Sequence, residues 1–153
     1  MTTINRRLGA LVAALLLTQA CAQHANTTPT TGTQKAATVL KDLAAGLQSV
    51  QTTVISANSS GLIDTNTTAT ILRICGTVNT LGLQASALIR AQTTGAIPLG
   101  LLPLLQQIAT DVNLDLQQGL AGIKDQKTLT TVEAIVTTIQ AGLAAAVIAV
   151  GGQ

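Results

Sequence analysis

Apolar residues recur at alternating spacings of three and four positions in four stretches of the chain. This spacing places apolar side chains on one face of an α-helix. The pattern predicts helices over residues 34–57, about 65–93, about 103–123 and 130–150. Amphipathic helices with short connections bury their apolar stripes by packing antiparallel around one core. The sequence therefore predicts an all-α, antiparallel four-helix bundle over residues 34–153.

The apolar faces of these helices predict the core of the bundle. Its members are aliphatic residues or alanine, because the chain contains no Phe, Tyr or Trp. Glycines interrupt each helix, and we expect them to permit close approach between helices. The predicted core residues are Ala36, Leu40, Leu43, Leu47, Val50 and Val54 in the first helix, Ile71, Ile74, Val78, Leu81, Ala85 and Leu88 in the second, Leu105, Ala109, Val112, Leu116 and Ile123 in the third, and Val132, Ile135, Val136, Ile139, Leu143, Ala146, Val147 and Val150 in the fourth.

Particular residues at the helix ends predict where each helix begins and stops. Asp64 is a good N-cap for the second helix, and Gly95 is a suitable C-cap for the same helix. Pro103 lacks an N–H and restricts the residue before it, so the third helix is expected to start at or just before Pro103. Thr130 and Glu133 fit the capping-box pattern at the start of the fourth helix.

Residues 1–22 have the three parts of an export signal. Arg6 and Arg7 supply the positive charge that holds the N-terminus on the cytoplasmic side of the membrane. Leu8–Leu17 is apolar but is about half as long as the roughly 20 residues that a membrane-spanning helix needs. Small residues follow this stretch, as a cleavage site requires. We therefore expect residues 1–22 to direct export, with cleavage after residue 20 or residue 22.

Two cleavage sites fit the residues that follow the apolar stretch. Ala20-Cys21-Ala22 matches the A-x-A pattern, and cleavage after Ala22 releases a soluble product. Leu17-Thr18-Gln19-Ala20-Cys21 resembles the bacterial lipoprotein box, in which cleavage falls just before a cysteine that carries lipid. That family usually places leucine three residues before the cysteine, whereas Leu17 stands four residues before it. The resemblance implies a membrane partner through a lipid anchor at Cys21, and both cleavage alternatives stay open.

Residues 23–33, QHANTTPTTGT, show no apolar period and predict a disordered tether rich in threonine and proline. The formal net charge of +2 is carried by Arg6 and Arg7, so the chain after the export signal is neutral. Nucleic-acid binding requires clustered cations and usually aromatic stacking as well. Because the chain offers neither feature, we expect no nucleic-acid partner.

The sequence contains no recognisable group of catalytic or metal-binding residues. The single histidine, His24, lies in the predicted tether, where it lacks metal-ligand partners. Cys75 lies on an apolar helix and is expected to be a small buried side chain. Asp111 and Asp115 share a helical face, but they lie beside the core positions, so we expect them on a solvated flank. We therefore predict no enzyme activity, no cofactor and no metal site.

Residues 96–105, AIPLGLLPLL, have no polar side chain and lie between the second and third predicted helices. They either close the end of the bundle as a lid or expose an apolar patch to a membrane, a hydrophobic ligand or a protein partner. Residues 134–150 are also apolar, but they are short for a membrane span and include polar side chains, so a core helix is favoured. The candidate contact residues are Ile97, Leu99, Leu101 and Leu102.

These observations predict a non-enzymatic exported protein of the cell envelope, a small lipoprotein that acts through protein–protein contacts or self-assembly. In a bacterium we expect it in the periplasm or at the outer membrane, and otherwise we expect it to be secreted. Two alternatives stay open. One is a carrier for an apolar small molecule held between helices, and the other is a membrane-perturbing protein that inserts residues 134–150.

Overall fold

The computed structural model describes residues 31–93 and 96–151. Segments α4 (Leu101–Asp111), η1 (Val112–Leu116) and α5 (Gln117–Leu120) are contiguous in the chain and form one rod, in which the π-helical turn η1 interrupts the α-helix. The described residues thus contain four helical rods and no strand, which confirms the predicted all-helical bundle for this part of the chain. The elements are α2 (Gly32–Ser59), α3 (Thr65–Ala91), α4 (Leu101–Asp111), the π-helical turn η1 (Val112–Leu116), α5 (Gln117–Leu120) and α6 (Gln126–Gly151).

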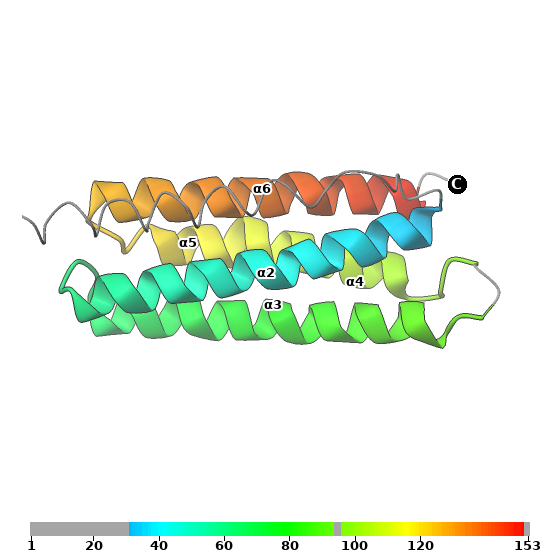
Figure 1. The fold of residues 1–153 in the computed structure, drawn as a ribbon, viewed down its shortest axis with the longest axis horizontal. Helices are drawn as coiled ribbons and strands as arrows, with labels where there is room; N and C mark the ends of the chain where they lie inside the picture. The colour runs from blue at the N-terminus through cyan, green and yellow to red at the C-terminus, as the bar shows by residue number, and fades with distance from the viewer. Residues whose placement is uncertain (1–30, 94–95, 152–153) are drawn as a thin grey trace, which may run out of the picture.

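Each rod packs against two neighbours. Helix α2 contacts α3 and α6, and the interrupted rod from α4 to α5 also contacts α3 and α6. The rods lie side by side along the long axis of the molecule, and the chain follows each of them from one end to the other (Figure 1). We call the end where α2 begins the tether end. The opposite end, formed by the turns at residues 60–64 and 121–125, is the far end.

The predicted core of α2 is confirmed, since all six of its predicted side chains are buried. In α3, however, Leu81 and Leu88 are only half-buried, and Cys75 and Gly82 occupy buried positions instead. Leu81 and Leu88 follow Ile74 at intervals of seven residues. A straight helix drifts by about 20° per heptad, so a strict seven-residue repeat turns progressively away from the core.

The start of α2 includes the last residues of the predicted tether. Thr31 and Gln34 form a capping box, with the Gln34 N–H donating to Thr31 Oγ1 and the Thr31 N–H donating to Gln34 Oε1, both at 3.2 Å. Residues 31–33 therefore belong to the helix and its cap. The export signal and the rest of the tether lie outside the described residues, as does Gly95. Helix α3 ends at Ala91, before the C-cap predicted for it.

Helix α6 begins earlier than predicted, because Asp125 rather than Thr130 caps it. The N–H and the hydroxyl of Thr128 both donate to Asp125 Oδ2, at 2.8 and 2.6 Å. Thr130 lies within the helix, and its hydroxyl donates to the carbonyl of Gln126. The capping box predicted from Thr130 and Glu133 was therefore wrong. Asp125, three residues before Thr128, instead accepts from a free N–H group in the first turn of a helix that starts at Gln126.

The third rod departs from regular α-helix immediately after Asp111. The expected solvated position of Asp111 was wrong, since this side chain is buried, whereas Asp115 is exposed. Asp111 lies between the buried residues Ile108 and Val112, and the π-helical turn that follows changes the register of the apolar positions. Gln107 Nε2 donates to Asp111 Oδ1 at 2.7 Å, which offsets part of the burial cost of the carboxylate.

Helices α2 and α6 approach each other closely at glycine positions, as expected. A Cβ added at Gly46 would lie 2.7 Å from Ile139 Cδ1, and one added at Gly32 would collide with the carbonyl oxygen of Ala149. Gly76 is an exception, because an added Cβ would meet nothing within 4 Å. Close approach thus explains Gly32 and Gly46, but neither Gly76 nor Gly142, where an added Cβ would meet nothing closer than Val39 Cγ1 at 3.6 Å.

Candidate functional site

A tight turn at the tether end fixes the most exposed large apolar side chain among the described residues. The Leu101 N–H donates to the Pro98 carbonyl at 3.1 Å, and Gly100 has φ 88° and ψ −9°. These values define a type II turn, whose third residue needs positive φ and is therefore usually glycine. Leu99 occupies the corner of the turn and is 96% exposed. Pro98 and Leu101 are buried on either side of it.

The four predicted contact residues do not share one environment. Leu101 is fully buried and belongs to the core, whereas Leu99 is almost fully exposed. Ile97 and Leu102 are half-buried and pack against the core. The apolar segment therefore divides between a part that closes the end of the bundle and a single leucine that points into solvent.

Contacts with all the neighbouring helix ends hold this turn in place. A Cβ added at Gly32, in the first turn of α2, would lie 3.7 Å from Ile97 Cδ1. One added at Gly100 would lie 3.7 Å from Leu88 Cδ1 in the last turns of α3, and one at Gly151 would lie 3.3 Å from Leu102 Cδ1. Ile97 and Leu102, on either side of the turn, thus lie close to α2 and α6, and Leu88 of α3 lies close to Gly100, so the residues that flank Leu99 are held against the neighbouring helices.

Charged side chains are divided unequally between the two ends of the bundle. The outermost turns at the tether end carry Lys35 and Arg90, both exposed, and no carboxylate among the described residues. Along the helices, the nearest carboxylates are Asp42 and Asp111, about 15 Å further from this end at 1.5 Å per residue. The remaining described residues carry four cations and six carboxylates, so the neutral domain has a tether end of +2 and a remainder of −2.

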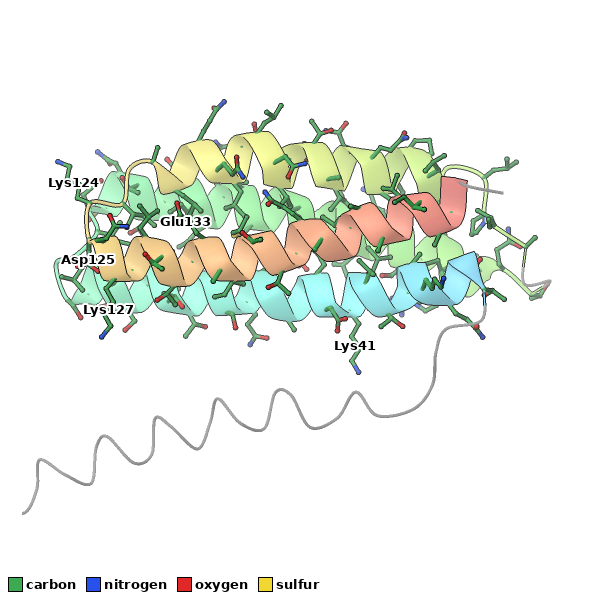
Figure 2. The ribbon with its side chains drawn as sticks, turned by 90° about the horizontal axis from the view of Figure 1, so that it is seen from above. Lys41, Lys124, Asp125, Lys127 and Glu133 are labelled. Carbon is green, nitrogen blue, oxygen red and sulfur yellow. The ribbon has the colours of Figure 1, made fainter. Side chains whose placement is uncertain are left out.

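The far end of the bundle has a mixed charge. Asp64 lies there, and Figure 2 shows Lys124, Asp125 and Lys127 together at this end. Hydrogen bonds from the N–H and hydroxyl of Thr67 lower the pKa of Asp64, and bonds from the hydroxyl and N–H of Thr128 lower that of Asp125. These carboxylates serve as helix caps, because their oxygens accept from the first turns of α3 and α6.

Grooves between helices offer three further surfaces. A groove of about 330 Å³ lies between α2 and α6, where Val39, Leu43, Ile135 and Ile139 give it a mainly apolar lining. A second, of about 470 Å³, lies between α5 and α6, and a third, of about 480 Å³, lies between α2 and α6 at the far end. Threonine and serine supply six of the ten residues that line the third groove. None of these grooves contains a cluster of catalytic side chains.

The residues considered for chemistry are not brought together. Burial raises the pKa of the Cys75 thiol to about 11, which keeps it protonated and unreactive near neutral pH. Asp111 is hydrogen-bonded to Gln107, away from the exposed Asp115. The described residues contain no group of three or more His, Cys, Asp or Glu side chains that fits a metal ion. Cys21 and His24 lie outside these residues.

Helix α6 is long and apolar enough to cross a membrane by length and composition. The mean hydropathy of its 18-residue apolar window is 1.9, and 28% of this window is buried inside the bundle. A core helix of a soluble protein meets the same criteria, so this finding is weak evidence for membrane association. Ile148, near the end of the helix, is 71% exposed.

The chain matches no protein-family model, and neither a curated protein nor a solved structure is significantly similar to it. Function therefore has to be argued from its own residues. The unequal division of charge was missed by the sequence reasoning, which treated the domain only as neutral. The sequence does contain a signal for this division of charge. Lys35 is near the start of the first helix and Arg90 is near the end of the second, and two helices of opposite direction place these positions at the same end of the bundle.

Proposed function

We propose that this chain is a non-enzymatic exported protein of the cell envelope, held at a membrane by lipid on Cys21 and acting by contact with another protein or with itself. In this proposal, residues 1–20 are the export signal and residues 21–153 are the mature chain. A tether joins the anchor to an antiparallel four-helix bundle. In a bacterium, such a protein is periplasmic or attached to the outer membrane.

One observation carries the proposal, namely the order of segments along the chain. Paired arginines, a short apolar stretch and a cysteine preceded by small residues occur in the order that export and lipid attachment require. A polar segment without apolar period follows, and the bundle starts at Gly32, where that segment ends. The short turns at residues 60–64 and 121–125 support antiparallel packing, because short connections join helices that reverse direction.

Intact-mass measurement of the protein isolated from its native envelope tests the anchor. We expect a chain that begins at Cys21, with added mass for a thioether-linked diacylglycerol, and incorporation of labelled palmitate. Cys21→Ser should abolish the labelling, whereas Cys75→Ala should not change it. An unmodified chain that begins at Gln23 would show instead that the protein is a soluble export product.

A second candidate function is membrane perturbation by α6. The specific observation in its favour is that the helix meets the length and hydropathy criteria for a span while most of its apolar window is not buried. After Glu133 the helix contains no charged residue, and the hydroxyl of Thr138 donates to the Ala134 carbonyl at 3.0 Å. Dye leakage from vesicles caused by the mature chain would favour this function over a contact role.

A further inference from the structure

We propose that the tether end of the bundle docks on an anionic lipid bilayer, with Leu99 entering the headgroup region and Lys35 and Arg90 lying over lipid phosphates. This inference deepens the proposed function and rests on its lipid anchor for the orientation of the bundle. The turn at Leu99, within the apolar segment 96–105, would be the membrane-binding surface of the bundle.

The charges of the tether end match the surface of such a membrane. Lys35 lies in the first turns of α2 and Arg90 in the last turn of α3, and both side chains are exposed. Arg90 is also held by a hydrogen bond from its Nε to the Ser86 carbonyl at 3.4 Å. Along α2, Asp42 lies seven residues or about 10 Å from Lys35, and Asp111 lies about 15 Å from the start of α4, so both distances exceed the Debye length of about 8 Å in physiological salt. The carboxylates of the described residues therefore do not cancel the attraction of this end to anionic headgroups.

Leu99 supplies the apolar contact that a charged surface alone lacks. It is 96% exposed at the corner of the type II turn, while Pro98 and Leu101 beside it are buried. Because the residues that flank Leu99 are held against α2, α3 and α6, its side chain is available to a bilayer without any rearrangement of the bundle. Cations at the same end of the bundle as a protruding apolar side chain form the combination that binds interfacial regions of bilayers.

The length of chain before the bundle places this end next to the bilayer. A lipid on Cys21 is separated from Thr31, the N-cap of α2, by ten residues, which span at most about 33 Å when fully extended. The tether therefore limits the distance of the tether end from the bilayer to about 33 Å, whereas the far end lies a further 28 residues or about 42 Å away along α2. Attachment through a short linker also raises the effective concentration of a weak surface into the millimolar range, so modest intrinsic affinity suffices.

Vesicle flotation of the mature chain with Cys21→Ser tests the surface without the lipid anchor. We expect the protein to float with vesicles of phosphatidylcholine and phosphatidylglycerol, and much less with phosphatidylcholine alone. Each of Lys35→Gln and Arg90→Gln should weaken binding roughly fivefold. Leu99→Ser should weaken it about tenfold, and raising the salt concentration should weaken it further.

Matched changes at the far end serve as controls. Leu62 is also exposed, at 47%, and Leu62→Ser should leave binding unchanged, as should the pair Lys124→Gln and Lys127→Gln. Equal thermal melting temperatures exclude unfolding as the cause of any loss. Absent binding, equal binding to neutral vesicles, or equal losses from far-end variants would overturn the docking surface. The intact mass of the native protein decides the anchor separately, so the two proposals fail in different experiments.

Discussion

The same substitution, glycine to alanine, is expected to have opposite effects at two positions between α2 and α6. An alanine at Gly46 would place its Cβ 2.7 Å from Ile139 Cδ1 and 2.8 Å from Ile139 Cγ1. An alanine at Gly142 would meet nothing closer than Val39 Cγ1, at 3.6 Å, which is an ordinary contact. Both positions lie inside long helices, so the gain in helix propensity is the same and only the packing differs.

The magnitudes follow from these two terms. Replacing glycine by alanine inside a helix stabilises it by about 1 kcal/mol. Crowding a well-packed core costs about 1–3 kcal/mol, and Ile139 has little room to move because it is only 6% exposed. We therefore expect Gly142→Ala to raise the free energy of unfolding by about 1 kcal/mol and Gly46→Ala to lower it by up to about 2 kcal/mol.

Urea unfolding of the mature chain, followed by circular dichroism, measures both changes. Ile139→Ala removes both crowding atoms, so in that background Gly46→Ala should become stabilising, although Ile139→Ala itself costs stability. If Gly46→Ala stabilises the unaltered protein as much as Gly142→Ala does, α2 and α6 do not approach closely at Gly46, and the explanation of this glycine is refuted.

Three further outcomes are expected. Because hydrogen bonds lower the pKa of Asp64 and Asp125 in the folded state, their contribution to stability is present above the unfolded value of about 3.9 and is lost as pH falls through the folded pKa. Asparagine keeps the caps, so the double change to Asn should flatten this part of the stability profile measured by denaturant unfolding at several pH values; an unchanged profile would contradict the assignment. Cys75, with its pKa of about 11, should react with iodoacetamide much more slowly at neutral pH in the native protein than in urea, and equal rates would mean that the thiol is exposed. Leu47→Asp should unfold the bundle, since it buries an unpaired charge, whereas Gln84→Asp on the exposed face should change the helical dichroism little; a folded Leu47→Asp protein would place Leu47 outside the core.

The fold was largely predictable where local pattern and packing agree. The six residues predicted for the stripe of α2 are all buried, because their spacing stays regular, and only Gly32, Thr33 and Ala57 at the ends of the stripe were missed. The start of α6 was not, since Thr130 and Asp125 both precede residues that complete a cap, and sequence pattern does not rank the two. Asp111 was misplaced for another reason. Counting along a regular helix cannot anticipate a π-helical turn, which changes the register between the positions before it, such as Asp111, and the positions after it.

The candidate surface at the tether end was only partly predictable. The apolar composition of residues 96–105 identified this segment as a candidate contact surface. The exposure of Leu99 and the burial of Leu101, however, depend on the tight turn between Pro98 and Leu101. The positive φ of Gly100 directs the chain so that one leucine points outward and the next enters the core. Lys35 and Arg90 are far apart in sequence, and only the packing of α2 beside α3 brings them to the same end.

The packing of each helix against its neighbours has a consequence for the time at which the bundle forms. Helix α2 makes its most extensive contacts with α6, the last helix of the chain, so the bundle cannot close until α6 has been synthesised. Helical bundles then fold within microseconds to milliseconds. Synthesis of 153 residues takes about 10–30 s at typical rates of translation. For the export route proposed above, a translocation path that needs an unfolded chain has to engage the N-terminus before α6 has been made, or a chaperone has to hold the helices apart.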